Sequence, residues 1–341
     1  MVSPKKEYIM KLGVDIYSIR SQEWNAFEYL DYCKKIGFDV VHFSDLRPFE
    51  STEDSYMKEV KAHADELDLD IEAGMGSICP TSTSFRKDKG MTAVEQVKQM
   101  LHMANILGSP VLRCFLGSFA DRKTEQPLET HIQSTIETCK AVKEMALELG
   151  IKLAVENHAG DMQGWELAML IEKAGPDYVG ACLDTGNPLS VIEDPAVTLK
   201  HLAPYVVTSH IRDCVLWSHP RGAAIQWVAM GDGNIGIKDW AEQYKAQCPN
   251  VPFTLEIITG SPPRVLNYLE EDFWSAFPNA RASEFACFER LVRKGLPFMG
   301  TMVTVGDSDI PPEYQAAQIA QQRFDLERSV KYCRKVLGVG E

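Results

Sequence analysis

The chain has 341 residues, of which 24% are charged and 45% hydrophobic, and its formal net charge is −13. This acidity argues against a nucleic-acid partner, which needs a basic surface, but it does not exclude an anionic substrate, since a bound metal can supply positive charge. The apolar stretches are well short of the roughly 20 residues of a membrane span. Nine cysteines without a C-x-x-C pair and a start without an apolar signal segment predict reduced thiols in a cytoplasmic protein.

Strand-like and helix-like patterns alternate along the chain. Strands are predicted at residues 10–16, 39–43, 69–73, 110–115, 151–155, 179–183, 206–209 and 252–255. Helices are predicted between them at residues 24–36, 52–67, 93–107, 128–149, 163–173, 195–202 and 237–246. This α/β alternation predicts a (β/α)8 TIM barrel over residues 8–260. A doubly wound sheet is disfavoured, because no glycine-rich phosphate loop follows the first strand.

Two segments interrupt the barrel pattern. Between His210 and the helix at residue 237, about 25 residues are expected to form a functional or site-covering loop. Residues 261–341 are expected to form a C-terminal extension packed on the barrel after strand eight, with a last helix at about 313–336. Its segment 261–311 is expected to cover part of the barrel mouth or to meet another subunit. The candidates for such an interface are Phe273, Trp274 and Phe277.

Four potential metal ligands stand at the ends of successive strands, namely Glu156, Asp184, His210 and Glu256. In a parallel barrel the C-terminal strand ends open on one face, so these side chains should converge there. A shell of carboxylates and one imidazole suits Mn²⁺, Mg²⁺, Co²⁺ or Zn²⁺ better than thiophilic ions. Any one of these residues alone is more typical of a turn or helix cap. All four in consecutive units predict a site for one divalent ion, which we expect to be Mn²⁺.

His158 is the candidate general base. It follows Glu156 by two residues, so in extended geometry both side chains project toward the barrel mouth. An unperturbed imidazole, with a pKa of about 6.5, is a better base near neutral pH than a ligating carboxylate. The alternative is that His158 only bonds a loop carbonyl or supports a metal ligand.

Further polar residues are candidates for substrate contacts, namely Arg113, Arg212, Arg221 and His42. Arg113 lies within a strand, where its charge needs a partner such as a substrate oxygen or Glu72. His42 closes the second strand and either reaches the mouth or is satisfied inside the barrel. Asp213, three residues after His210, is expected to orient a ligand or the following loop. Tryptophans such as Trp227 could stack on a sugar ring, although core packing is their usual role.

Several motifs together carry a resemblance to a known family. They are Val-Glu-Asn-His158, Leu-Asp-Thr-Gly-Asn187, Ser-His-Ile-Arg-Asp213, Met-Gly-Asp-Gly-Asn234 and Leu-Glu256. In this order, over roughly residues 10–260, the chain resembles the xylose isomerase-like TIM-barrel superfamily of sugar isomerases and epimerases. The resemblance implies a divalent ion on Glu156, Asp184, His210 and Glu256. It also implies that Glu156 and Glu256 flank the substrate carbon and exchange its protons.

The resemblance leaves the reaction open. Asn187 stands where many relatives have a substrate-binding His, and the run Glu156 to Asp161 resembles the large subunit of C-glycoside deglycosidases. We therefore expect an isomerase or epimerase that removes a proton α to a sugar carbonyl through a metal-stabilised enediolate. The alternative is a lyase that β-eliminates an aglycone from 3-keto glycosides. A non-catalytic polyol-binding barrel is disfavoured by the intact ligand set. The expected partners are a sugar or glycoside and either further copies of the chain or a small subunit, with neither nucleic acid nor membrane.

Overall fold

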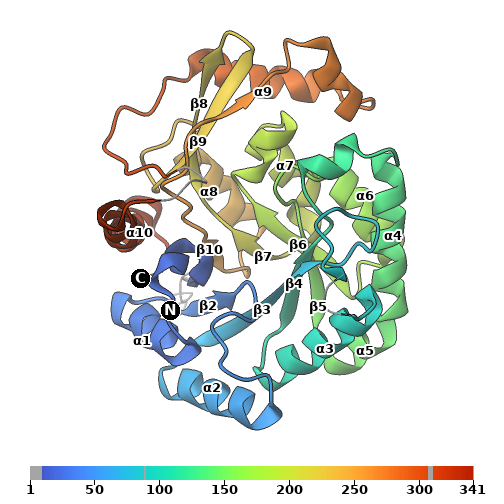
Figure 1. Cartoon of the computed structure of the whole chain (residues 1–341), viewed down its shortest axis with the longest axis vertical. Coiled ribbons are helices and arrows are strands. Elements are labelled where there is room, and N and C mark those ends of the chain that lie inside the picture. The colour runs from blue at the N-terminus through green and yellow to red at the C-terminus, as the bar shows by residue number, and fades with distance from the viewer. Residues whose placement is uncertain (1–9, 88–89, 306–309, 341) are drawn as a thin grey trace, which may run out of the picture.

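The structure is a computed structural model that describes residues 10–87, 90–305 and 310–340. Eight parallel strands form one sheet that curls into a barrel surrounded by helices (Figure 1). In pairing order they are β10 (Phe253–Leu255), β1 (Leu12–Asp15), β2 (Val40–Phe43), β3 (Asp70–Ser77), β4 (Val111–Phe115), β5 (Lys152–Glu156), β6 (Val179–Asp184) and β7 (Val206–His210). The Ile211 amide donates to the Thr254 carbonyl at 2.7 Å, which brings the end of β7 beside β10. The predicted TIM barrel is confirmed.

The outer helices follow the predicted positions closely. They are α1 (Ala26–Ile36), α2 (Asp54–Glu66), α3 (Ala93–Ile106), α4 (Leu128–Ala141), α5 (Lys143–Leu149), α6 (Gly164–Ala174), α7 (Pro195–Leu202) and α8 (Ile237–Gln247). Capping boxes begin α1 at Asn25 and α3 at Thr92. The single helix predicted at 128–149 is two helices, because Val142 leaves helical geometry with φ −111° and ψ 4°.

Polar side chains fill the carboxyl end of the barrel interior, above a core of apolar residues. Around the barrel, Asp15 is in register with His42, and His42 with Glu72. On the other side Asp184 is in register with His210. All five side chains are buried. Because buried polar groups need partners, this layer must satisfy itself or hold a ligand.

The expected loop between His210 and residue 237 is wrong, because most of it forms a β-hairpin. β8 (Asp213–His219) pairs antiparallel with β9 (Gly222–Val228), and β11 (Arg264–Leu266) adds a third strand. This hairpin rises beyond the barrel with α9 (Ala282–Lys294) beside it (Figure 1). Strand-forming residues on both sides of the turn explain the hairpin, and Gly222 takes the φ of +142° that the turn requires.

The hairpin and the C-terminal extension enclose a second apolar core. Its members include Leu216 and Ile225 from the hairpin and Phe273, Phe277 and Phe288 from the extension. Phe273 and Phe277 are 2% and 4% exposed, so their assignment to a subunit interface is wrong. They pack within their own chain because the hairpin, which the sequence reading missed, offers them an apolar face.

The last helix, α10 (Pro312–Tyr332), returns to the first turn of the barrel. Its Gln322 exchanges hydrogen bonds with Ser21 in the 3-10 helix η1 (Ile16–Gln22). The Gly340 amide also donates to the Met10 carbonyl at 3.1 Å. The two ends of the described chain are thereby joined beside β1. Among the described residues, no helix is long and apolar enough to cross a membrane.

Candidate metal centre and substrate cavity

The four predicted ligands lie together at the carboxyl end of the barrel. One donor atom from each of Glu156, Asp184, His210 and Glu256 lies within 4.8 Å of the others, and all four side chains are buried. His210 Nδ1 is 3.2 Å from Glu156 Oε2 and 3.7 Å from Glu256 Oε2. Three buried carboxylates so close together repel one another unless a cation lies among them. This donor set fits a divalent ion, and no thiolate is needed to complete it.

Two arginines reach into the carboxylate cluster. Arg113 Nε donates to Glu156 Oε2 at 2.5 Å, so the partner of this strand arginine is Glu156 and not Glu72. The Arg212 guanidinium donates to both Asp184 and Glu256. Burial works to raise the pKa of Glu156, but Arg113 and His210 hold it well below its usual value. Burial raises the pKa of Asp184 to about 6, although Arg212 acts against this change.

Short polar side chains fix the strand ends that carry these ligands. Asn157 donates to the Asp184 carbonyl and accepts from the Asp184 amide, both at 2.9 Å, which clamps β5 to β6. Asn187 donates to Glu156 Oε1 at 3.1 Å. A Cβ at position 186 would lie 2.5 Å from Arg212 Cδ, so only a glycine there leaves room for the Arg212 side chain.

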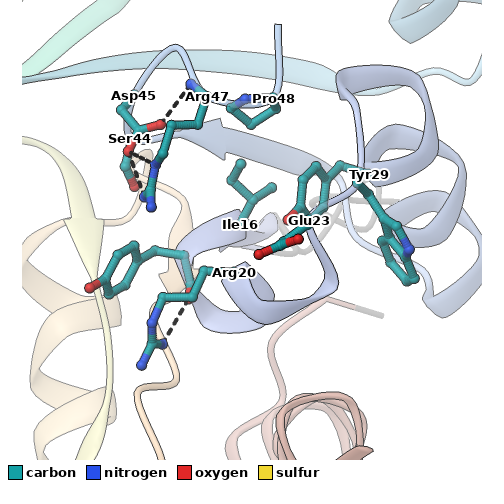
Figure 2. A pocket seen from close by; sticks show the side chains of 10 residues that line it. Ile16, Arg20, Glu23, Tyr29, Ser44, Asp45, Arg47 and Pro48 are labelled. Atoms are coloured by element: carbon teal, nitrogen blue, oxygen red, sulfur yellow. Dashed lines mark hydrogen bonds and ion pairs between the residues drawn. The ribbon is translucent and has the colours of Figure 1, made fainter. Parts of the chain in front are cut away.

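A cavity of about 850 Å³ reaches the ligand cluster at Glu256, which lines its wall. Its wall includes Arg113, His158, Asn187, Arg212 and Glu256 among the residues predicted to act on the substrate. Arg221 does not line this cavity, since it lies at the hairpin turn with its exposed side chain paired to Glu270. A second hollow of about 320 Å³ adjoins the cavity and shares with it residues that follow β1 and β2 (Figure 2).

His158 lies in the cavity wall in one fixed orientation. Its ring stacks on Phe115 with the centroids 3.7 Å apart, and Nδ1 is 2.8 Å from the Gly117 carbonyl. Because a carbonyl only accepts, Nδ1 carries the proton and Nε2 keeps a lone pair. Burial lowers the pKa of His158 to about 4, so the expectation of a pKa near 6.5 is wrong. The ring is neutral at physiological pH and is a weaker base than a free imidazole.

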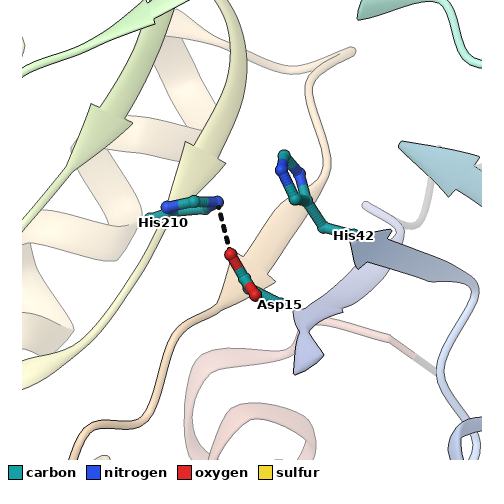
Figure 3. Close-up of side chains that lie close together, drawn as sticks. All are labelled: Asp15, His42 and His210. Atoms are coloured by element: carbon teal, nitrogen blue, oxygen red, sulfur yellow. Dashed lines mark ion pairs between the residues drawn. The ribbon is translucent and has the colours of Figure 1, made fainter. Parts of the chain in front are cut away.

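Asp15, which was not predicted from the sequence, lies beside the Nε2 edge of the His210 ring. Asp15 Oδ2 lies 3.2 Å from His210 Nε2, and the His42 ring stands edge-on to His210 at 4.8 Å (Figure 3). Asp15 ends β1, and that position was its only signal in the sequence. His42 Nδ1 is 3.1 Å from Glu72, which leaves Nε2 buried without a partner among the described residues. His42 is completely buried and does not line the cavity.

Asp213 positions the turn that follows the hairpin. Its carboxylate accepts hydrogen bonds from the amides of Cys214, Gly231 and Gly233 at 2.9 to 3.1 Å. A Cβ on Gly233 would lie 1.8 Å from an Asp213 oxygen, so glycine is required there. This contact explains why the Arg-Asp213 and Gly-Asp-Gly motifs occur together. Asp213 orients the loop and, among the described residues, its carboxylate bonds these amides and none of the four ligands.

The family of the chain follows from a match over residues 30–273 to the model of the xylose isomerase-like TIM barrel. The chain belongs to this family. In Escherichia coli K12, the uncharacterized protein YihM is 26% identical over 97 residues, which cover 28% of this chain and 29% of YihM. The chain therefore matches less than a third of the length of that curated relative.

Solved structures of sugar epimerases share the fold at low sequence identity. D-psicose 3-epimerase from Clostridium cellulolyticum H10 is 16% identical with a TM-score of 0.61, covering 96% of this chain and 99% of the epimerase. The 3-keto-D-glucoside 4-epimerase YcjR from E. coli is also 16% identical, with a TM-score of 0.54 over 72% of this chain and 90% of YcjR. At this identity these structures establish the fold alone.

Proposed function

We propose that this family member is a divalent-metal-dependent isomerase or epimerase of keto sugars. The observation that carries the proposal is the buried set of three carboxylates and one imidazole, one of which, Glu256, lines a cavity of about 850 Å³. A divalent ion held by Glu156, Asp184, His210 and Glu256 would polarise a sugar carbonyl and stabilise the enediolate left by proton removal. Similarity to a psicose epimerase and a keto-glucoside epimerase supports the same substrate class.

The side chains of this chain supply the remaining chemistry. His158 Nε2 is unprotonated and lies in the cavity wall, where it can take the proton next to the carbonyl. Asn187 and Arg212 line the same wall and can hold substrate oxygens. Epimerisation needs a second proton carrier on the opposite face of the carbon. We assign that role to Glu256, which lines the cavity, and to the buried Glu156 of the same cluster, and this pair replaces His158 altogether if its low basicity prevents it from acting.

A lyase acting on 3-keto glycosides is the second candidate. The specific observation in its favour is a base, His158, that lies in the cavity wall and outside the proposed ligand set. The cavity also lies in the upper half of the usual range of about 300–1,000 Å³ for ligand pockets, which leaves room for an aglycone. In this reaction His158 removes the proton next to the 3-keto group, and the aglycone leaves from the neighbouring carbon.

Assembly with further copies of the chain or with a small subunit remains part of the proposal. Large apolar side chains are exposed on the extension, with Leu296 at 74% and Met299 at 89%. Sedimentation at several concentrations measures this state directly.

Solvent deuterium exchange followed by NMR tests the proposed reaction. The protein in Mn²⁺ is incubated in D₂O with D-psicose, D-tagatose and a 3-keto glucoside. Deuterium at the carbon next to the carbonyl, with interconversion of ketoses, is the expected result. Release of a free aglycone from the 3-keto glycoside assigns the lyase instead. Bound metal without exchange or elimination on any of these substrates contradicts both reactions.

A further inference from the structure

Arginines gather around the cavity although the chain carries a net charge of −13. The described wall contains two acidic residues, Asp45 and Glu256. The same wall contains six arginines, namely Arg20, Arg47, Arg86, Arg113, Arg212 and Arg264. An acidic protein that concentrates cations around one concave surface creates a local positive potential there.

Four of these arginines are held in pairs on two aromatic rings. Arg20 and Arg47 lie over the Tyr17 ring, with their guanidinium carbons 4.5 and 5.8 Å from its centroid. The guanidinium groups of both extend to one side of the adjoining hollow, away from Glu23 (Figure 2). Arg264 and Arg212 lie over the Trp227 ring at 4.3 and 5.1 Å. Two cations on one ring repel each other, and an anion between such groups relieves that repulsion.

Three of these arginines have carboxylate partners within the described protein, and two others do not. Arg113 and Arg212 contact the ligand carboxylates, and Arg47 is paired with Asp45 at 2.6 Å. Within the described ranges, Arg20 donates only to the Tyr17 carbonyl, and Arg264 makes no ion pair. Enclosure lowers the pKa of both groups, and neighbouring Arg212 adds to this effect. Both guanidinium groups remain charged.

We propose that Arg20 and Arg264 form an oxyanion subsite at the cavity mouth, and that the substrate carries a carboxylate or phosphate group that binds there. The planar donor arrangement of arginine suits both anions. Arg20 and Arg264 line the same cavity as Glu256, so one substrate in this cavity can contact both the proposed metal site and the subsite. The inference rests on the proposed function for the sugar, whereas the binding of an anion stands on the arginines alone.

Binding of inorganic phosphate tests the subsite without turnover. Calorimetric titration at constant ionic strength should show saturable binding to the wild-type protein. A charge-assisted contact is worth about 1.5–3 kcal/mol, so the double variant Arg20→Gln, Arg264→Gln should bind roughly tenfold more weakly or worse. The matched control is Arg221→Gln, an exposed arginine paired with Glu270 outside the cavity. It should bind as the wild type does.

The subsite is refuted if the double variant binds phosphate as tightly as the wild type does. It is also refuted if the control variant loses as much phosphate affinity as the double variant. Far-ultraviolet circular dichroism shows whether each variant is folded, and Arg20→Lys, which keeps the charge, should retain part of the affinity. Mn²⁺ binding is measured on the same samples. If the wild-type protein binds phosphate but not Mn²⁺, the proposed function alone is contradicted. If it binds Mn²⁺ but not phosphate, the subsite alone is contradicted.

A second titration distinguishes the two anions. Glucose 6-phosphate, glucuronate and glucose are compared through quenching of tryptophan fluorescence, since Trp227 lines the cavity. Preference for glucose 6-phosphate assigns a phosphate ester, and preference for glucuronate assigns a carboxylate. If neither acid binds more tightly than glucose, the proposal of an anionic substrate is wrong.

Discussion

Asp15 Oδ2 lies 3.2 Å from His210 Nε2, on the side of the imidazole ring opposite the carboxylate Glu156. A carboxylate this close favours the tautomer that carries its proton on Nε2, which leaves the Nδ1 lone pair for the proposed ion. We therefore predict that Asp15→Asn weakens Mn²⁺ binding by about 10- to 100-fold, the usual effect of losing such a support. Equilibrium dialysis with Mn²⁺ measures this change. The exposed Asp31→Asn is the control, and equal affinity in both variants would remove Asp15 from the site.

The ligand carboxylates should govern the metal content. Glu156→Gln and Asp184→Asn each remove one charge from the cluster, so both purified variants should contain much less divalent metal than the wild type. The barrel should stay folded, because the proposed ion serves catalysis more than stability. Elemental analysis and circular dichroism provide the two readouts, with the exposed Glu137→Gln as control. Undiminished metal in both variants would refute the site.

His158 should be the base that moves the substrate proton. His158→Asn should keep metal and fold but lose about 10²- to 10⁴-fold in solvent exchange, as is usual when a general base is removed. The exposed His102→Asn is the control for the substitution. An unchanged exchange rate would transfer the role to Glu156 and Glu256. Because burial lowers the pKa of His158 to about 4, the wild-type rate should stay level near neutral pH and fall as the pH approaches 4.

Glu193 should make the stability of the fold depend on pH. It accepts a hydrogen bond from the Gly164 amide at the start of α6, and burial raises its pKa to about 7. A carboxyl group whose pKa is higher in the folded than in the unfolded state stabilises the folded protein while it is protonated. This stabilisation is complete below the unfolded-state pKa of about 4.3, and it is lost as the pH rises through 7. This contribution to the free energy of unfolding reaches about 4 kcal/mol at most. Urea unfolding at several pH values should show a flatter profile for Glu193→Gln than for the wild type. An identical slope in the two proteins would contradict the prediction, and the exposed Glu148→Gln should keep the wild-type slope.

The second core should stabilise the extension. Phe288 is fully buried there, so Phe288→Ala should lower the free energy of unfolding by about 3–5 kcal/mol, as is typical for a buried phenylalanine. Phe324, which is 66% exposed on α10, provides the matched control Phe324→Ala and should change stability little. Denaturant unfolding monitored by circular dichroism measures both. Equal midpoints would mean that the extension does not unfold with the rest of the chain.

The sequence was informative where a local pattern repeats. Glu156, Asp184, His210 and Glu256 each close an apolar strand, so barrel geometry was enough to bring them together. Asp15 closes β1 in the same way, but a single acid without a visible partner gives no signal. Arg20 and Arg264 are 244 residues apart, from 264 − 20, and meet only through the barrel and its hairpin. The hairpin itself was missed because its turn, His-Pro-Arg-Gly222, lacks the usual Asn-Gly or Asp-Gly pair.

The pairing of β1 with β10 also sets the order in which the chain becomes functional during its synthesis. One edge of β1 pairs with β2 early in the chain, but on its other edge Leu12 to Val14 pair with Phe253 to Leu255, and the fourth proposed ligand, Glu256, follows directly. A nascent chain therefore exposes an unpaired β1 edge until nearly three quarters of its residues have left the ribosome. The pairing of β10 with β1 closes the barrel and, in the same step, brings Glu256 to the other proposed ligands. A truncated or stalled product would thus lack the fourth proposed ligand, so capture of the proposed ion would be confined to finished barrels.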